Sequence, residues 1–548
     1  MDWQKNILIV AILAITLVLF IRFKEFNDAH ASQPTPPAAS NTSSVNSNVS
    51  QDAVNHTVTT NTTTQSKIIH IKTDTLNVSI DTFGGDIVEV SLPKHPVALD
   101  KPNEPFMLLD KHEGTTYVTQ SGLLGINGTE GSDGSRPIFS SEKDLYVLSN
   151  NEKELVVNLT YQQDQVKITK QFIFKAGEYH VELKYLIDNQ SDSTWSAKFF
   201  ARIIHDGKRL TKVSALQMNP FLGVATTTDD ENYKKYQFKD IEKDSSQGKI
   251  TFTHQNGWIS LVQHYFISAW VPDPKSNILY SIFQDKKSLL YVIGFETPEL
   301  TVAPKQQESV EATFYAGPKD TTKLEALSPH LDLTVDYSWL WWIAKPLFAL
   351  MKFIHSFLGN WGLAIIGLTF TVKLVFYKLS ESSYKSMAKM KKLQPKLAEL
   401  KERYGEDKQR YSQEMMKMYK TEKVNPLGGC LPLLIQMPVF ISLYWVLMES
   451  VELRQSPFYL WIQDLSQMDP YFILPILYGV SQFVTMKFSP QPPDPMQAKI
   501  MQMLPFVFTF MFLWFPSGLV LYWLTNNILQ IIQQQIITRK IERADAKT

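Results

Sequence analysis

The sequence predicts a mixed fold: a polytopic α-helical membrane core that carries one large extracytoplasmic β-sandwich domain. The core is expected to hold a bundle of five spans in addition to an N-terminal signal-anchor helix. Residues 27–335 are polar and strand-like, whereas residues 339–538 are mostly apolar and aromatic and are interrupted by one charged block. The mean hydropathy of −0.14 averages these two unlike halves, so it describes neither of them.

Composition excludes several classes of protein. The 548 residues contain 54 Lys and Arg against 54 Asp and Glu, so no overall charge points to DNA as a partner. Cys430 is the sole cysteine, which rules out a disulfide framework and any cysteine-based zinc or iron–sulfur site.

The N-terminus predicts a signal-anchor helix within residues 1–26. Asn6 to Ile21 form an uncharged run, and a helix of sixteen to about twenty residues here would just span a hydrocarbon layer of about 30 Å. Cleavage after a secretory signal is the alternative, because Ala29-His30-Ala31 offers a small-x-small pattern. That pattern lies beyond the charged residues Arg22, Lys24 and Glu25, which favours an uncleaved anchor.

Residues 27–66 predict a disordered linker. They contain no Lys or Arg, and about half of them are Ser, Thr or Asn. Such a composition cannot bury enough apolar surface to offset the entropy of ordering the chain.

Residues 67–335 predict a β-sandwich on the far side of the membrane. Apolar side chains alternate at Leu76, Val78 and Ile80, and the alternation resumes after the Gly84-Gly85 turn. No metalloprotease, nucleophile-elbow, phosphate-loop or dinucleotide motif occurs in this domain. Its scattered histidines are therefore interpreted as ordinary surface or core residues, and no catalytic or metal site is expected.

Residues 336–360 predict an amphipathic helix lying in the lipid headgroup layer. Ser338, Lys345 and Lys352 recur every seven residues among many aromatic side chains, and Pro346 is expected to kink the helix or restart it. A buried core helix of the soluble domain is the alternative.

A charged helical hairpin is predicted over residues 383–423, between two spans at 361–380 and 427–448. It contains 12 Lys and Arg against 6 Asp and Glu, and this positive excess places it in the cytoplasm. Gly405-Glu406-Asp407 is expected to separate its two helices. A net charge of +6 also suits contact with anionic headgroups or ribosomal RNA.

Three further spans are predicted at residues 471–487, 499–513 and 519–538. The last two follow from residues 500–538, which carry no charge over about twice one membrane thickness and contain the turn signal Phe515-Pro516-Ser517-Gly518. The loop at 449–469 has Arg454 against four acidic residues, as an outer loop should. With the anchor, six crossings leave both termini in the cytoplasm.

Lys373 is the main candidate for a functional residue, because a cation inside a span is costly and generally faces a bundle interior or a wet cavity. Snorkelling to the cytoplasmic surface is the ordinary alternative. Thr369 shares its helix face one turn away, and Gln436 lies mid-span in the next helix. This pattern favours a hydrated, amphiphilic pocket within the bundle.

Several motifs resemble the signature of the YidC membrane protein insertases, within the larger YidC/Oxa/Alb superfamily. They include Asn425-Pro426-Leu427-Gly428-Gly429-Cys430-Leu431-Pro432, Gln436-Met437-Pro438 and Trp514-Phe515-Pro516-Ser517-Gly518. Ser386-Met387-Ala388-Lys389-Met390 in the hairpin is similar too. Together with the anchor, the linker and the outer domain, the resemblance covers nearly the whole chain in its long Gram-negative form.

The resemblance implies an insertase and chaperone of the bacterial inner membrane, with its large domain in the periplasm and no cofactor. A groove open to cytoplasm and lipid would receive nascent membrane proteins, alone or beside the Sec translocon. Relatives usually carry Arg at the position of Lys373, so Lys keeps the charge but loses the planar donor fork. The residues that the resemblance places in the groove are Lys373, Thr369, Gln436, Tyr522 and Trp523.

The resemblance also implies that the hairpin contacts the ribosome and the signal-recognition-particle receptor, and that membrane lipids surround the core. The hairpin residues expected to make these contacts are Lys385, Lys389, Lys391, Lys392, Lys408 and Arg410. The outer domain would be a β-supersandwich like that of sugar epimerases.

Two other functions remain open on the residues alone. A small-solute transporter would also place a cation in a polar midplane pocket, although no inverted repeat is visible. A membrane-anchored periplasmic carbohydrate-active protein would place its chemistry in residues 67–335, where no motif marks it.

Overall fold

The structure is a computed structural model that describes residues 66–545, except 113, 132–133, 210–219, 246–247, 405–406, 423–430 and 489–494. The predicted anchor at 1–26, nearly all of the predicted linker at 27–66, and Cys430 lie outside the described residues. The chain forms two compact units: residues 393–424 belong to the first, and residues 55–392 with 425–548 make up the second.

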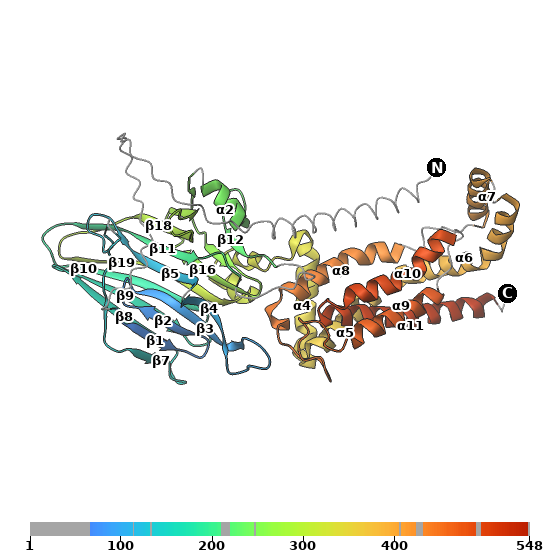
Figure 1. The fold of residues 1–548 in the computed structure, drawn as a ribbon, viewed down its shortest axis with the longest axis horizontal. Helices are drawn as coiled ribbons and strands as arrows, with labels where there is room; N and C mark the ends of the chain where they lie inside the picture. The colour runs from blue at the N-terminus through green and yellow to red at the C-terminus, as the bar shows by residue number, and fades with distance from the viewer. Residues whose placement is uncertain are drawn as a thin grey trace, which may run out of the picture. The chain divides into compact units, whose positions relative to one another are not determined.

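The first half of the described chain folds into two large β-sheets (Figure 1). One sheet has ten strands, in the spatial order β14 (Ile250–His254), β17 (Ile278–Gln284), β18 (Tyr291–Val302), β11 (Trp195–His205), β5 (Thr115–Leu124), β4 (Pro105–His112), β3 (Asp86–Pro96), β2 (Asn77–Asp81), β1 (Ile68–Lys72) and β7 (Leu145–Val147). The other has nine strands, in the order β13 (Lys234–Gln237), β12 (Gly223–Thr226), β15 (Ile259–Val262), β16 (Phe266–Pro272), β19 (Gln306–Pro318), β10 (His180–Asn189), β9 (Val166–Lys175), β8 (Glu154–Gln163) and β6 (Ser140–Ser141). Short helices α2 (Phe238–Ser245) and α3 (Thr321–Leu327) accompany them. The predicted β-sandwich-like domain is thus confirmed.

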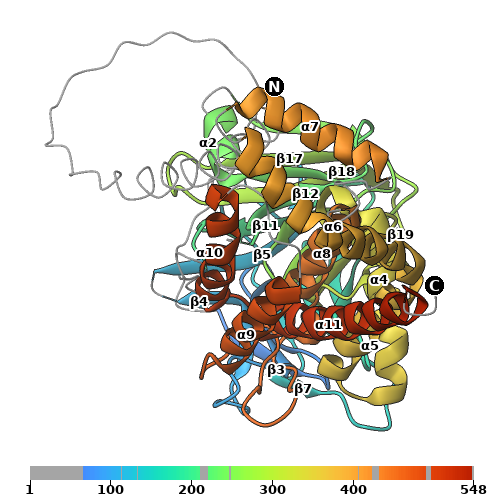
Figure 2. The same ribbon diagram turned by 90° about the vertical axis from the view of Figure 1, so that its right-hand side faces the viewer.

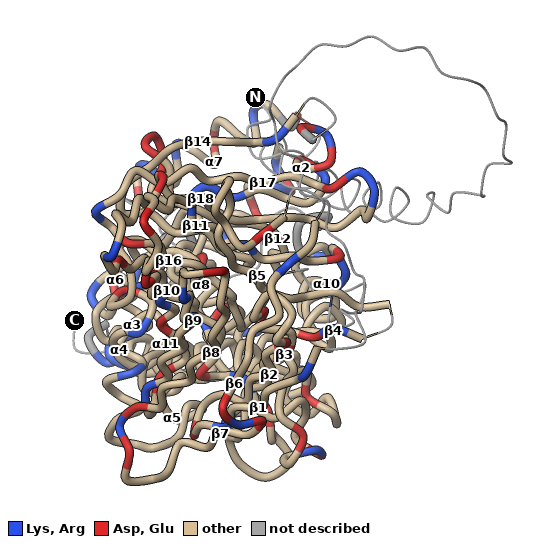
Figure 3. The backbone as a smooth tube through the Cα atoms, turned by 90° about the vertical axis from the view of Figure 1, so that its left-hand side faces the viewer, with Lys and Arg blue, Asp and Glu red and all other residues tan. Residues whose placement is uncertain are grey.

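Alternating burial explains why these segments form strands with one face inward. In β9, every second side chain from Val166 to Phe174 is buried, and β10 repeats the pattern beside it in antiparallel register. Apolar side chains from both sheets meet in one core, where each fully buried side chain stabilises the fold by about 1.5–3 kcal/mol. Acidic and basic residues are intermixed along the outer loops and strands (Figure 3).

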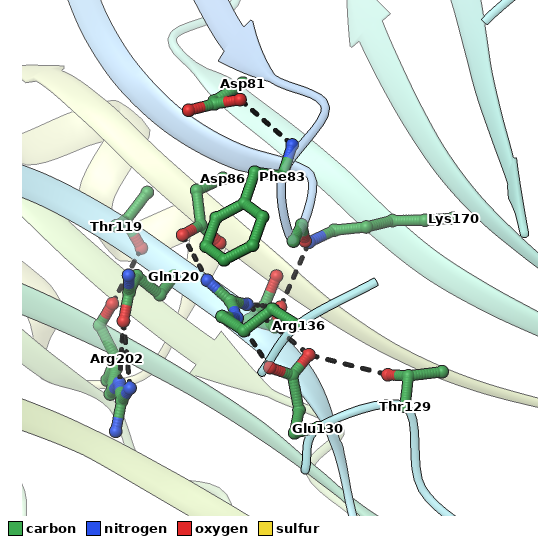
Figure 4. Close-up of polar contacts among 12 residues, drawn as sticks. Asp81, Phe83, Asp86, Thr119, Gln120, Thr129, Glu130, Arg136, Lys170 and Arg202 are labelled. Atoms are coloured by element: carbon green, nitrogen blue, oxygen red, sulfur yellow. Dashed lines mark hydrogen bonds and ion pairs between the residues drawn. The ribbon is translucent and has the colours of Figure 1, made fainter. Parts of the chain in front are cut away.

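A cluster of charged groups lies inside this sandwich (Figure 4). The guanidinium of Arg136 donates from Nε to Glu130 at 2.5 Å, from Nη1 to Asp86, and from Nη2 to the Ser121 carbonyl at 2.9 Å. Burial alone would lower the pKa of Arg136, but the two carboxylates raise it above its ordinary value. The guanidinium therefore stays charged, with both acidic partners buried beside it.

Lys170 lies next to this cluster and is held differently. Its Nζ donates to the carbonyls of Gly84 at 2.9 Å and Ser121 at 3.1 Å, and the rings of Phe172 and Tyr185 lie within 5.3–5.6 Å of it. Burial lowers the pKa of Lys170 to about 7. The sandwich thus surrounds an uncommon internal amine with hydrogen-bond acceptors and aromatic faces.

The second half of the chain is helical. Its helices are α4 (Trp341–Leu358), α5 (Trp361–Val375), α6 (Tyr377–Tyr404), α7 (Lys408–Thr421), α8 (Leu431–Glu449), α9 (Ile473–Phe488), α10 (Pro495–Phe512) and α11 (Ser517–Asp545). Helix α11 packs against both α5 and α9 (Figure 2), and α4 packs against α5 and α8. The uncharged run at 500–538 is divided between α10 and α11, with a turn between Phe512 and Ser517.

Helix α4 presents two faces. Ala344, Phe348 and Met351 are buried, whereas Trp342 and Phe357 are 60% and 74% exposed. Pro346 lies within the helix, one turn from its start, and the helix continues past it. Both of these faces carry apolar or aromatic side chains, so α4 exposes a broad aromatic surface; its place in the headgroup layer stays a prediction.

The helix that begins at Trp361 is shorter than the segment 361–380 expected for it. Asn360 caps its first turn by accepting a hydrogen bond from the Leu363 backbone N–H at 3.0 Å. It ends at Val375, and the backbone N–H of Phe376 still donates to carbonyls of the last turn. Helix α6 then continues at an angle of 67° to α5. In the described part of the chain, no single helix passes a length-and-hydropathy test for a membrane span, whereas α5 and α6 pass it together as a bent pair.

Candidate functional site

Lys373 and Gln436 meet between α5 and α8. Lys373 Nζ donates to Gln436 Oε1 at 3.5 Å, a long hydrogen bond between groups 63 residues apart in sequence. Both side chains are partly buried. Within the described residues, no carboxylate lies within 4 Å of Lys373 Nζ, so its charge has an amide neighbour but no ion-pair partner.

The polar contact continues to a third helix. Gln436 Nε2 donates to Asn526 Oδ1 on α11, and Asn526 is buried. Three helices thus contribute one polar side chain each to a chain of hydrogen bonds. Such a group of amides and one amine offers both donors and acceptors to an incoming polar segment.

Thr369 is close in sequence to Lys373 but does not join this chain of contacts. It is 1% exposed, and its hydroxyl donates to the Ile365 carbonyl of its own helix at 2.7 Å. Because its hydroxyl already donates to the preceding turn, Thr369 is a packed side chain that takes no part in the hydrogen bonds of Lys373 and Gln436.

Tyr522 and Trp523 place an aromatic wall on α11. The Tyr522 ring is buried, and the ring of Phe440 on α8 lies 4.5 Å from the Trp523 ring in an edge-on contact. Trp523 also packs against Phe512 at 5.6 Å, and its buried indole N–H has no hydrogen-bond partner among the described residues.

A second amide contact lies farther along α11. Asn527 donates to Ser481 Oγ at 3.1 Å and to Gln482 Oε1 at 2.9 Å, both on α9. These residues tie α9 to α11 by ordinary interhelical hydrogen bonds.

The predicted hairpin residues fall on α6 and α7. Lys385 pairs with Glu381 at 2.9 Å, and Lys389, Lys391 and Lys392 follow on α6. Asp407 caps α7 by accepting from the backbone N–H of Arg410 at 3.0 Å, and Lys408 is the first residue of that helix. Lys396 of α6 forms an ion pair at 2.6 Å with Glu422, which directly follows α7, and this pair links the two helices of the hairpin.

The sequence analysis missed the contacts that fasten the β-domain to the helical half. Lys319 Nζ pairs with Glu449, the last residue of α8, at 2.6 Å, and both side chains are at most 9% exposed. Lys345 of α4 pairs with Asp332 at 2.7 Å, whereas Lys352 pairs within the helical half with Glu452 at 3.0 Å. The seven-residue stripe on α4 predicted a helix in the headgroup layer and gave no sign of these acidic partners.

The described residues contain no group of three or more His, Cys, Asp or Glu side chains arranged to hold a metal ion.

Comparison with known proteins assigns the family. Residues 68–350 match the model of the YidC periplasmic domain, and residues 353–544 match that of the 60Kd inner membrane protein. A protein of Cellvibrio japonicus named membrane protein insertase YidC is 57% identical over the full length of both chains. The chain belongs to the YidC family.

A second relative agrees with the assignment to the YidC family. A membrane protein insertase YidC of Saccharophagus degradans is 50% identical over 99% of this chain and 100% of its own. A crystal structure of an active YidC insertase with its first transmembrane domain resolved covers 86% of this chain and 92% of its own, at 19% identity and a TM-score of 0.38. The two family models divide at residues 350–353.

Proposed function

We propose that the chain inserts newly made proteins into the bacterial inner membrane and assists their folding, using the polar cluster at Lys373 as the floor of a substrate groove. Its full-length similarity to proteins named as insertases supports the activity. The cation of Lys373 carries the mechanism, because it lies between apolar helices with Gln436 as its neighbour and no carboxylate among the described residues within ion-pair distance.

The physical steps follow from this placement. Removing apolar surface from water lowers the free energy of a segment by about 25 cal/mol per Å², so the passage of an apolar segment from a groove into lipid is favourable. The barrier lies in the polar flank, which must cross with the segment. Lys373, Gln436 and Asn526 replace part of the water that this flank loses, and the positive charge attracts an acidic flank.

Lateral release needs an apolar surface beside the groove. Leu374 and Val375, which follow Lys373 directly, are 56% and 73% exposed, and Ile532 on α11 is 49% exposed. A client span that leaves the cluster therefore meets side chains suited to lipid. Met437, 40% exposed beside Gln436, adds a flexible thioether that adapts to different apolar clients.

The membrane arrangement belongs to the same proposal. Five spans and an N-terminal anchor would place the β-domain in the periplasm and both termini in the cytoplasm, with α4 in the headgroup layer. The basic hairpin formed by α6 and α7 would contact the ribosome or the signal-recognition-particle receptor, and the chain would act alone or beside the Sec translocon. The positive excess of residues 383–423 supports a cytoplasmic hairpin.

Site-specific photocrosslinking tests the groove. A photoreactive residue is placed at 436 or 523 in the full chain, and ribosomes stalled on a short single-span client are added. We expect crosslinks to the nascent span from both positions. Position 480 on α9 is the matched control, because Val480 is 57% exposed on an apolar helix and should crosslink lipid instead. Equal client crosslinking at 480 and 523, or none at 436 and 523 with ribosomes bound, would contradict the groove.

A further inference from the structure

A cavity of about 560 Å³ lies where the β-domain meets the helical half, remote from Lys373 in sequence and built by other helix ends. Its walls come from the β-domain around Phe106 and Gln263, the end of α8 at Met448, the outer loop containing Arg454 and Trp461, and the turn between α10 and α11. The volume falls in the range of small-molecule sites, about 300–1,000 Å³.

Two residues that line the cavity have side-chain donors without a partner among the described residues. Gln263 is 9% exposed, and its buried side-chain N–H₂ has no acceptor in the described part of the chain. The same holds for the buried indole N–H of Trp461. A buried donor without an acceptor costs about 1–3 kcal/mol, so two of them in one wall indicate a site for an acceptor that binds there.

Arg454 adds a positive charge to the same wall. One terminal nitrogen, Nη2, donates to the carbonyls of Pro96 at 2.7 Å and Val97 at 3.3 Å, and the guanidinium lies 5.4 Å from the Phe266 ring centre. A guanidinium has five N–H donors, so most of its donor capacity is left for a further partner. Among the described residues, no carboxylate lies within 4 Å of its nitrogens.

The acceptors in the wall are largely occupied. Asp464 Oδ1 accepts from the backbone N–H groups of Gln455 at 3.0 Å and Ser466 at 2.8 Å, and from the Ser466 hydroxyl at 2.6 Å. His264 contributes no charge near neutral pH, because burial lowers its pKa to about 3, and it hydrogen-bonds the Met448 carbonyl through Nε2. Arg209 also lines the cavity, so the wall carries two guanidinium groups against the one carboxylate of Asp464 and has a surplus of positive charge.

We propose that this cavity binds the headgroup of an anionic phospholipid from the outer leaflet, with the phosphate near Arg454, Gln263 and Trp461. Phosphate oxygens are acceptors only, which matches a wall of unused donors. The proposal rests on the membrane orientation given above, in which the ends of α8, α10 and α11 lie at the outer headgroup layer.

The surroundings favour a lipid over an acidic peptide. Val97, Leu99 and Met468 line the cavity and are 44–46% exposed, and Trp461 and Trp514 are the amphipathic aromatics that favour the headgroup level. An apolar rim accepts the glycerol and first methylenes while the acyl chains remain in the bilayer. A water-soluble acidic segment would leave this rim exposed to water.

Lipid titration of the purified full chain in neutral detergent tests the site. Fluorescent phosphatidylglycerol and phosphatidylcholine are compared on the wild-type chain and on Arg454→Gln and Gln263→Glu. We expect phosphatidylglycerol to bind at least fivefold more tightly than phosphatidylcholine, and each substitution to weaken it about tenfold. Gln263→Glu is nearly isosteric, so it reverses the electrostatics of the wall even if Arg454→Gln disturbs the contact with Pro96.

Lys286→Gln is the matched control, since Lys286 is an exposed lysine in the loop before β18. It should bind phosphatidylglycerol within twofold of the wild type. Wild-type affinity in Gln263→Glu, or equal affinity for the two lipids, would overturn the proposal. Displacement of phosphatidylglycerol by equimolar inorganic phosphate would identify a soluble-phosphate site instead, and displacement by an acidic peptide would identify a peptide site.

Discussion

Two buried cations in this protein have opposite surroundings. Arg136, inside the β-sandwich, is 8% exposed and contacts two carboxylates and one carbonyl. Lys373, between α5 and α8, is only partly buried and has one long hydrogen bond to an amide. The first cation is fully engaged by its own fold, whereas the second has donors to spare.

This difference separates a structural charge from the one proposed to be functional. A buried ion pair holds its partners in one arrangement, because removing any member leaves an uncompensated charge. A cation without a fixed counter-ion costs stability and is useful only where something else arrives to neutralise or hydrate it. The β-domain should therefore lose stability, and the helical half should lose activity, when its cation is removed.

Arg136→Met should give the largest loss of stability. It leaves Asp86 and Glu130 buried without a cation, which destabilises a protein by about 3–5 kcal/mol. Thermal unfolding of the purified full chain, followed by the circular dichroism of its β-domain, measures the change. Lys198→Met, on an exposed position of β11, is the matched control and should shift the transition little. Equal shifts in both variants would show that the cluster stabilises nothing.

Lys170 sharpens the comparison through its pH dependence. Its pKa in the folded state is about 7, below the ordinary value of 10.5, so between these values the unfolded chain binds one proton more. Stability should therefore rise with pH from 7 to 9.5, by up to about 1.4 kcal/mol per pH unit from this group. Lys170→Met should flatten that rise in denaturant unfolding measured at each pH. An unchanged slope would mean that Lys170 titrates normally in the fold.

Lys373→Ala should change activity and not stability. The loss of a partly hydrated charge should alter the free energy of unfolding by no more than about 0.5 kcal/mol. Insertion of a client with an acidic translocated flank should fall about tenfold, which corresponds to about 1.4 kcal/mol. Protease protection of such a client in proteoliposomes measures insertion. Lys373→Arg, which keeps the charge, should retain activity. Insertion of a client with an uncharged flank should be unaffected by Lys373→Ala. Equal losses for the two clients would contradict a role for the charge.

The smallest effect is expected at an exposed pair. Lys396 and Glu422 lie 2.6 Å apart between α6 and the end of α7, but their side chains are 58% and 37% exposed. Surface pairs of this kind contribute about 0–1 kcal/mol, so Lys396→Gln should change thermal unfolding barely measurably, and less at high salt. A shift as large as that of Arg136→Met would mean that the hairpin depends on this contact.

Local patterns in the sequence predicted much of the fold. Alternation marked the strands because side chains of a strand point to opposite faces at a period of two. The same alternation contains Lys170 among Val166, Ile168, Phe172 and Phe174, so a lysine at an inward position could have revealed the buried amine. In the helical half, the uncharged run and its Pro-Ser-Gly turn anticipated the end of α10 and the start of α11.

The candidate site was also partly visible. Lys373 and Gln436 could be singled out because polar side chains within apolar helices are costly, and the structure brings the two together. Their role as a groove stays a prediction. Thr369 was chosen for its position one turn away, but its hydroxyl bonds its own helix, a preference that helix periodicity alone does not reveal.

The sequence by itself determined the two-part architecture and the family, and it singled out the cation of Lys373 within an apolar segment, because each depends on patterns or motifs within a few dozen residues. Only the tertiary structure decided which charges are paired. Arg136 meets Asp86 across 50 residues, Lys319 meets Glu449 across 130, and Arg454 reaches Pro96 across 358. Such contacts depend on the packing of strands and helices into one interior, where burial forces each polar group to find a partner or to remain available for a ligand.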